Sequence, residues 1–363
     1  MDGSAPTADG WLIDITESDD GRSVVLWRKE RRSGRVRRTA VEFRPPFLVD
    51  GPRDALRDLE RRLENEPSVA GVARRVLSPS LYDRRARTVL SVTPARNPRR
   101  RTLARTIDAL GGFERYRLYD VDLVPPQLYH LAHALYPFAP VTGSGSDLIA
   151  TEPAEAIDYA TPPLRVARLE VHIAGERRGR IPPPDGRIGS VRVGDVTLEG
   201  PEEELLRALV DELARSDPDV LLTQGGDAFD FPWLYRRASA CGLGPDVFGL
   251  GRERAPFRPS RRARSFESYG VVHHRDAPYP APGRFHIDRE NSFLFDDTDI
   301  AGLVDAARLS RLSLSTVVRQ SPGTCFTAME MAHALALGAH VPWKKNRAET
   351  FRRGDHLVAA DRG

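Results

Sequence analysis

The stretch DVLLTQGGDAFDFPWLYRRASAC, residues 219–241, decides the fold of this chain. It begins with a short apolar run at residues 220–222, which predicts a buried strand. A glycine-rich turn follows, and an amphipathic segment that starts near Pro232 predicts a helix. Asp227 and Asp230 lie between the two, and a carboxylate at such a helix start is well placed to hold a metal ion or to face a phosphate. The stretch therefore predicts a strand–loop–helix unit with a polar site at the strand end.

The sequence around this stretch predicts an α/β domain over residues 161–310. Residues 164–171, LRVARLEV, alternate in the manner of a strand. Residues 201–215 start with proline and three glutamates and continue with an apolar stripe, which predicts a helix whose first turn complements the helix dipole. The strand at residues 220–223 then returns, so strands and helices alternate along the chain.

The first 160 residues predict a separate α+β domain. Apolar segments around two turns at residues 11–43 indicate an antiparallel meander. Residues 47–123 then predict a β-α-β-β-α-β unit, whose helices are expected at residues 52–64 and 98–110. Such a unit can carry single-stranded nucleic acid on its sheet, although it is also a general packing solution. Pro125-Pro126 and residues 151–163 are expected to be linkers.

The composition is that of a globular chain without a disulfide framework. The chain has 363 residues, a formal net charge of +3 and only two cysteines, Cys241 and Cys325. No apolar run approaches membrane-spanning length and the first residues show no signal-peptide pattern, so a cytoplasmic, nucleoid-associated location without a membrane partner is expected.

The order of residues within the 219–241 stretch closely resembles the second exonuclease motif of family B DNA polymerases. The segment after residue 310, with Pro342-Trp343-Lys344-Lys345, resembles the connector between exonuclease and palm in that family. The resemblance implies an α/β fold in which an α+β N-terminal domain (1–160) precedes a ribonuclease H-like exonuclease domain with a mixed sheet (161–310). A helical connector (311–363) to a missing palm is expected to follow. It also implies that Asp288, in GRFHIDRENSF, is structural.

The same resemblance implies a degenerate nuclease site. In the first motif of the family an aspartate precedes a glutamate by two residues, and here Arg168 precedes Glu170. In the second motif Gly225 replaces an asparagine, whereas Asp230 is kept. The third motif has only a weak counterpart in Phe295 and Asp299, without the tyrosine that would orient a water.

The loss at Arg168 bears directly on metal binding. Two-metal phosphodiester hydrolysis needs several carboxylates that converge on two cations, and an arginine adds a positive charge that cannot be removed by deprotonation. We therefore expect no cofactor, and Mg²⁺ or Mn²⁺ at Glu170 and Asp230 only if the site works. Arg168 is expected either to pair with Glu170 and Asp230 in place of metal or to face solvent, which would indicate a different register for the first motif.

Clusters of positive charge suggest where DNA would bind. Four arginines lie close together in the first domain, and the connector adds an aromatic and two basic residues; together these form the predicted DNA-binding set Arg31, Arg32, Arg35, Arg37, Trp343, Lys344 and Lys345. Six further arginines lie between residues 252 and 264. Because lysine occurs only three times in the chain, a general preference for arginine is an equally good explanation of each cluster.

Two functions are consistent with these patterns. The first is an exonuclease-inactive N-terminal and exonuclease-like portion of a family B polymerase homologue, of the inactivated archaeal and bacterial branch, which binds DNA or acts as a scaffold in replication or repair. The second is the front half of an active, split or truncated DNA-directed DNA polymerase with 3′→5′ exonuclease activity. The expected partner is single-stranded or primer-template DNA, and the second function adds a polypeptide that carries palm, fingers and thumb. Whether the chain is itself an enzyme is left open at this stage.

Overall fold

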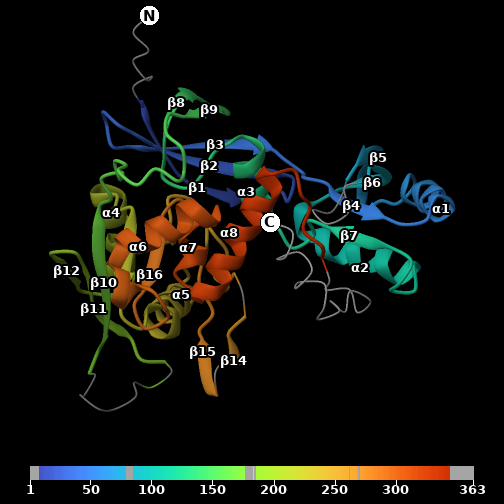
Figure 1. Cartoon of the computed structure of the whole chain (residues 1–363). Coiled ribbons are helices and arrows are strands. Elements are labelled where there is room, and N and C mark those ends of the chain that lie inside the picture. The colour runs from blue at the N-terminus through green and yellow to red at the C-terminus, as the bar shows by residue number, and fades with distance from the viewer. Residues whose placement is uncertain are drawn as a thin grey trace, which may run out of the picture. The chain divides into compact units, whose positions relative to one another are not determined.

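The computed structural model describes residues 8–343 except 79–84, 176–182, 184, 261 and 269. The chain divides into two compact units that are not continuous in sequence (Figure 1). Unit 1 contains residues 1–16, 25–41 and 130–330, and unit 2 contains residues 17–24, 42–129 and 331–363. Because these units are defined by compactness alone, they do not test the three consecutive domain ranges expected from the sequence, which stay predictions.

The meander forms the centre of an antiparallel sheet. Within the described residues this sheet has five strands in the order β3-β2-β1-β8-β9, formed by Gly10–Glu17 (β1), Ser23–Glu30 (β2), Val36–Glu42 (β3), Ala139–Ser144 (β8) and Asp147–Ala150 (β9). Strand β1 pairs with β8 in antiparallel register, with Trp11 opposite Pro140. The sheet therefore joins residues from both sides of the intervening βαββαβ segment.

A mixed sheet forms the framework of the site. Its order is β12-β11-β10-β13-β16, with strands Val166–Ile173 (β10), Ile188–Val193 (β11), Val196–Glu199 (β12), Val220–Thr223 (β13) and Phe285–Asp288 (β16). Strands β10, β13 and β16 are parallel to one another, whereas β11 and β12 are antiparallel to their neighbours. This arrangement confirms the expected α/β class with a mixed sheet. The carboxyl ends of the parallel strands meet at one edge, where ligands of such sheets usually bind.

Helices pack against the mixed sheet and complete one hydrophobic core. Helix α4 (Glu202–Ser216) buries four leucines that share a cluster with Leu169 and Val191 of the sheet. Helix α5 (Phe231–Ala240) adds Phe231, Trp233 and Leu234. Helices α6 (Phe295–Ser310), α7 (Leu314–Val317) and α8 (Pro322–Ala336) follow in sequence. In the described part of the chain no helix is both long and apolar enough to cross a lipid bilayer.

Unit 2 contains the β-α-β-β-α-β succession. Its elements are Phe47–Asp50 (β4), Arg53–Leu63 (α1), Val69–Leu77 (β5), Arg87–Pro94 (β6), Arg100–Leu110 (α2) and Arg117–Tyr119 (β7), with a short 3-10 turn at Asn97–Arg99 before α2. The strands pair antiparallel in the order β5-β6-β4-β7. The apolar stripes of the two helices bury against this sheet, with Leu56 and Leu59 from α1 and Leu103 and Ile107 from α2.

Several elements differ from the expectation from sequence, among them helix α3 and a polar hairpin. Pro125-Pro126 starts helix α3 (Pro125–Ala132) instead of a linker, because proline has no N–H to lose in the first helical turn and its φ already suits a helix. A hairpin of Arg264–Ser268 (β14) and Val271–Arg275 (β15) was not expected. Its strands are too polar to show the apolar alternation by which a strand is recognised.

A buried ion pair connects the two sheets of unit 1. The Nζ atom of Lys29 in β2 donates to the carboxylate of Asp219, immediately before β13, and both side chains are almost fully buried. Asp219 also accepts from the backbone N–H of Arg165 at 2.8 Å and from Arg252 at 2.9 Å. A buried carboxylate requires such compensation, since an unpaired charge in the interior is costly. Arg252, one of the six clustered arginines, therefore has a structural partner.

Candidate functional site

The site lies in the loop between β13 and α5, and Asp288 holds this loop in place. Asp288 lies at the end of β16 and accepts hydrogen bonds from the backbone N–H groups of Gly225 (2.8 Å), Asp227 (2.8 Å) and Glu290 (3.2 Å). Gly225 has φ of 82°, a left-handed conformation that glycine adopts without strain. The expectation that Asp288 is structural is confirmed, because its oxygens are used to cap backbone donors.

Asp227 is the centre of a buried ionic network. Arg319, which follows α7, forms a two-pronged ion pair with it, with distances of 2.7 Å from Nε to Oδ2 and 2.9 Å from Nη2 to Oδ1. His286 approaches it at 3.3 Å and the Asn291 amide donates to it at 2.7 Å. Burial alone would raise the pKa of Asp227, but the His286 and Arg319 contacts hold that pKa below its usual range. Burial lowers the pKa of His286.

Asp230 is buried among other carboxylates. It ends a single π-helical turn, Gly226–Asp230, that leads into α5. Burial, then the Asp288 carboxylate and the more weakly acting Glu170 and Glu290, together raise the pKa of Asp230 to about 7, against a hydrogen bond with the Val171 backbone that lowers it. Asp230 and the end of β10 are therefore neighbours, as the first and second motifs require. At neutral pH a substantial fraction of Asp230 is protonated.

Arg168 and Glu170 share one face of β10 but do not pair with each other. Arg168 is exposed, and within the described part of the chain its side chain makes no ion pair. Glu170 instead faces Arg192 of β11, its direct cross-strand partner, at 3.6 Å. Arg168 therefore does not pair with Glu170 and Asp230 as expected, and Glu170 contacts Arg192 instead. Strand register explains this contact, since residues opposite each other in an antiparallel pair lie closest. Arg168 faces solvent, which is the outcome expected for a different register of the first motif, whereas Glu170 lies beside Asp230 as the proposed register requires.

The weak third motif lies in α6. Phe295 is buried at the first turn, whereas Asp299 is exposed at a kink with φ of 55° and ψ of −165°. A non-glycine residue rarely adopts this backbone conformation. The Asp299 side chain accepts a hydrogen bond from the next backbone N–H at 2.7 Å, so one of its oxygens already has a local partner.

The predicted DNA-binding arginines lie on the β2–β3 hairpin. Arg31, Arg32, Arg35 and Arg37 are all exposed. Arg37 pairs with Glu30 at 2.7 Å, and the Arg31 guanidinium lies 5.9 Å from the ring centre of Trp11. Within the described residues, Arg32 and Arg35 make no ion pair. Trp343 belongs to unit 2, and Lys344 and Lys345 lie outside the described residues.

Sequence patterns did not reveal several of the residues around the site. Arg319, His286 and Asn291 surround Asp227 but come from segments 59 to 92 residues downstream of it in sequence, and Arg192 lies opposite Glu170. A cross-strand partner can be predicted only once the register is known. One signal was available: an apolar core position occupied by a histidine, His286, indicates a buried polar partner nearby.

The mixed sheet and the loop after β13 bring two carboxylates close together, Glu170 within β10 and Asp230 at the start of α5. Residues 189–294 match the family model described as DNA polymerase family B, exonuclease domain. This region is therefore similar to the exonuclease domain of family B DNA polymerases, and the resemblance recognised in residues 219–241 is confirmed.

Individual relatives agree with this assignment. The chain is 34% identical over 86 residues to DNA polymerase 1 of Pyrococcus abyssi, which is 23% of this chain and 11% of the relative. It is 40% identical over 48 residues to a DNA polymerase of Pyrococcus horikoshii, which is 13% of this chain and 4% of the relative. The family B DNA polymerase structure from Pyrobaculum calidifontis matches with a TM-score of 0.67 and 18% identity, over 93% of this chain and 52% of that one. This last likeness concerns the fold, and the chain spans about half the length of that polymerase.

The residues present do not fit a pair of catalytic metal ions. The resemblance of the first motif puts Arg168 at the position of the family's aspartate, and Glu170 is paired with Arg192. Among the described residues, no group of three His, Cys, Asp or Glu side chains is arranged to hold a metal ion. Two-metal hydrolysis requires several carboxylates that bridge ions about 3.5–4 Å apart, and this arrangement does not supply them.

Proposed function

We propose that this chain is the N-terminal and exonuclease-like portion of a family B DNA polymerase homologue that binds DNA without 3′→5′ exonuclease activity. The observation that carries the proposal is Arg168, a permanent positive charge two residues before Glu170 on the same strand face. A guanidinium there repels the cations that the hydrolytic site requires and offers no lone pair to coordinate them.

The electrostatics of Asp230 makes any metal binding at this site dependent on pH. Burial and the surrounding carboxylates raise the pKa of Asp230 to about 7. A metal ion would have to displace a proton from part of the Asp230 population at neutral pH, since coordination requires the deprotonated form.

A labelled primer assay tests the proposal. The purified chain is incubated with a 5′-labelled single-stranded oligonucleotide and with Mg²⁺ or Mn²⁺, and we expect the substrate to keep its length. An Asp230→Ala variant is the matched control for contaminating nucleases. The proposal is wrong if the parent shortens the oligonucleotide in an EDTA-sensitive manner and Asp230→Ala does not.

The alternative is that the chain is the front half of a working polymerase with an active exonuclease. One observation favours it: Glu170 and Asp230 are both kept as neighbours. The same assay is then repeated with a polypeptide that carries palm, fingers and thumb, if one is encoded next to this chain. Metal-dependent nucleotide incorporation or primer shortening that needs both polypeptides would establish this alternative.

A further inference from the structure

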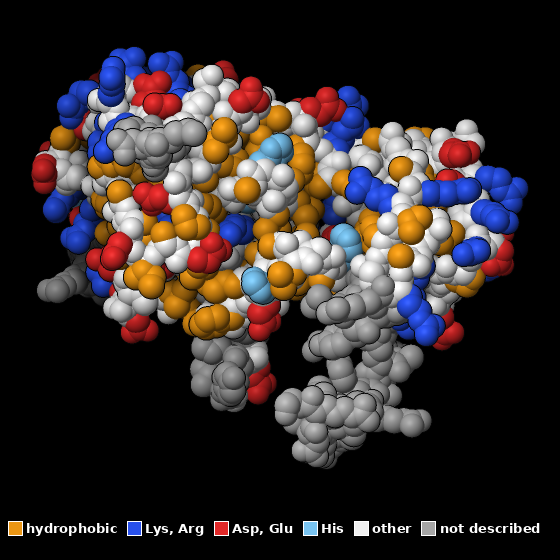
Figure 2. Space-filling model, turned by 45° about the horizontal axis from the view of Figure 1, so that its top comes forward, with side chains coloured by type: hydrophobic (Ala, Val, Ile, Leu, Met, Phe, Trp, Pro, Cys, Tyr) orange, Lys and Arg blue, Asp and Glu red, His pale blue; other side chains and the backbone are white. Residues whose placement is uncertain are grey.

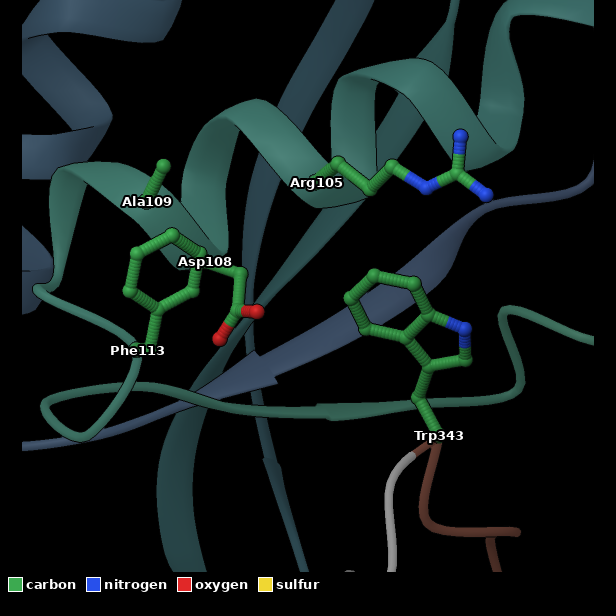
Figure 3. A pocket seen from close by; sticks show the side chains of 5 residues that line it. All are labelled: Arg105, Asp108, Ala109, Phe113 and Trp343. Atoms are coloured by element: carbon green, nitrogen blue, oxygen red, sulfur yellow. The ribbon is translucent and has the colours of Figure 1, made fainter.

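A pocket in unit 2 combines aromatic rings with an arginine. It has a volume of about 570 Å³ and is lined by Arg105, Asp108 and Ala109 of α2, by Phe113 and by Trp343 (Figure 3). The three α2 residues share one helix face because they are three and four positions apart. All five residues belong to the same compact unit. The volume lies within the range of small-molecule sites, about 300–1,000 Å³.

Phe113 is held at this pocket in an unfavourable backbone conformation. It follows the end of α2 with φ of 65°, and its side chain is 68% exposed. Its backbone N–H donates to the carbonyl of Asp108 at 2.9 Å, which closes the helix end. A glycine would satisfy this position without strain, whereas a bulky aromatic residue adopts it only rarely. Because a phenylalanine is strained in this backbone conformation, its exposed ring is a candidate for binding a ligand.

Trp343 forms the opposite wall and is fixed by the fold. Its backbone N–H donates to the carbonyl of Leu118 at 2.9 Å, and the preceding Pro342 bridges to Tyr119 of β7. The half-buried indole packs against the hydrophobic core of unit 2. Figure 3 shows the Phe113 ring and the Trp343 indole on either side of the Asp108 carboxylate. Two aromatic groups therefore line one opening from two different segments of the chain.

The charges at the pocket favour a ligand with an anionic group. The Arg105 side chain extends above the indole (Figure 3), is exposed, and makes no ion pair within the described residues. Residues 42–129 contain more arginines than carboxylates. Figure 2 shows Lys and Arg side chains gathered over the surface that α1, β5 and β6 form, at the right of the view. Arg105 would thus attract an anionic group at the edge of the pocket, above the indole and away from the Asp108 carboxylate between the two rings.

We propose that this pocket binds a base of single-stranded DNA, with the base against Phe113 and Trp343 and a flanking phosphate on Arg105. Aromatic side chains bind bases by stacking regardless of sequence, and an adjacent cation holds the backbone. The proposal rests on the proposed DNA binding and adds a site of different chemistry. The β2–β3 hairpin offers only charge, whereas the pocket recognises the base itself.

The test compares two oligonucleotides that carry the same charge. A fluorescent dT12 and an abasic oligonucleotide of the same length are titrated with the full chain, and the ratio of the two dissociation constants reports base recognition. We expect dT12 to bind at least about fivefold more tightly, the lower end of the stacking contribution of one base. Phe113→Gly should remove most of this ratio, and it should fold well because glycine suits the left-handed position. Trp343→Phe should keep part of the ratio, since a smaller ring remains.

A matched control and the overturning outcomes complete the design. Phe326→Ala removes an equally exposed phenylalanine of α8 outside the pocket, and we expect it to leave the ratio unchanged. Equal binding of the two oligonucleotides by the parent overturns the proposal, as does a ratio that survives Phe113→Gly. If charge reversal at the hairpin weakens binding of both oligonucleotides and leaves the ratio of their dissociation constants unchanged, the hairpin and the pocket are two separate binding sites. Absence of binding to either oligonucleotide overturns the proposed DNA binding together with the pocket.

Discussion

Arg168 shows how one side chain changes what a strand end can do. It shares a face with Glu170, and it remains exposed in the described part of the chain while Arg192 takes the ion-pair position. The effect on function that we propose for it is electrostatic exclusion of cations, which does not require a stabilising contact. The sequence left two arrangements open: Arg168 as a buried substitute for metal ions, or Arg168 facing solvent. Removal of the side chain would destabilise the protein in the first arrangement and would change its stability little in the second.

Substitution of Arg168 distinguishes the two outcomes. We expect Arg168→Ala to change the free energy of unfolding by no more than about 0.5 kcal/mol, as is usual for exposed positions. Loss of a buried partner would instead cost about 3–5 kcal/mol. Thermal unfolding of Arg168→Ala and of Arg168→Asp is measured with and without Mn²⁺. Only Arg168→Asp, which adds a third carboxylate beside Glu170 and Asp230, should gain stability from Mn²⁺. A large loss of stability in Arg168→Ala would instead indicate that Arg168 pairs with Glu170 and Asp230.

Asp14 in β1 is expected to give the protein a pH-dependent stability. Burial raises the pKa of Asp14 to about 7 from a usual value of 3.8, against hydrogen bonds from Ser313 and the Ile15 N–H that lower it. Because the folded-state pKa lies above the unfolded-state value, the ionised carboxylate opposes folding. This penalty is absent below about pH 4, grows as pH rises, and is complete above about pH 7. At 1.36 kcal/mol per unit its upper limit is about 4 kcal/mol.

Asp14→Asn should therefore be more stable than the parent at pH 8, and the difference should be small at about pH 4, near the unfolded-state pKa. Melting temperatures measured in steps between these values would show the difference opening from about pH 4 to about pH 7. The exposed Asp195→Asn, in the turn between β11 and β12, serves as a control for general charge effects. If the difference between Asp14→Asn and the parent is the same at all pH values, Asp14 does not titrate as described.

At the level of elements, Arg319 connects the helix after α6 to the nuclease-like loop. Its guanidinium is largely buried against the fully buried carboxylate of Asp227 and also donates to the carbonyls of His286 (3.2 Å) and Ser315 (3.0 Å). The loop that carries Asp230 is thus held from the side of α7 as well as by Asp288. We expect Arg319→Ala to lower the free energy of unfolding by about 3–5 kcal/mol, since it leaves a buried charge without its partner.

Matched substitutions make this prediction specific. Arg319→Lys should recover only part of the loss, because an ammonium group cannot form the two parallel bonds of a guanidinium. Arg207→Ala removes a surface arginine that pairs with Glu203 within α4 at half-exposed positions, and it should cost less than about 1 kcal/mol. Chemical denaturation of the three variants would contradict the assignment if Arg319→Ala and Arg207→Ala were equally stable.

Elements with a clear apolar period were predictable from the sequence, whereas elements held by distant polar partners were not. Helices α1 and α4 lie within one residue of the expected ranges 52–64 and 201–215, because their apolar stripes and proline starts are local signals. Strands β8 and β9 and the polar hairpin β14–β15 had no such signal. At the site, the sequence identified Glu170 and Asp230 as neighbours through a family motif. It could not place Arg192 or Arg319, whose contacts depend on register and tertiary packing.

For the whole molecule, the distribution of arginine predicts how DNA affinity responds to salt. If the exposed arginines of the β2–β3 hairpin bind the phosphate backbone as proposed, they release counterions, so the logarithm of the binding constant should fall linearly with the logarithm of salt concentration. The double variant Arg32→Glu with Arg35→Glu should flatten this slope by at least about 1.4, the loss of two phosphate contacts on a single strand. Fluorescence anisotropy between roughly 50 and 200 mM salt measures it.

The control for this experiment is Arg215→Glu, an exposed arginine of α4 that pairs with Glu212. It changes the net charge in the same direction but lies on a different element, so its slope should stay closer to that of the parent. A slope that is flat in the parent, or equal in the hairpin variant and the parent, would make the hairpin an ordinary solvated surface.

The buried ion pair of Lys29 with Asp219 has a consequence for chemical labelling. Lysine occurs only at positions 29, 344 and 345 of the chain, and the Lys29 amine is 2% exposed in the folded protein. Amine-reactive dyes or cross-linkers require an accessible, deprotonated amine, and a buried ammonium paired with a carboxylate offers neither. Native-state acylation should therefore leave Lys29 unmodified, and its modification, followed by mass spectrometry, would time the moment at which the two sheets of unit 1 come apart.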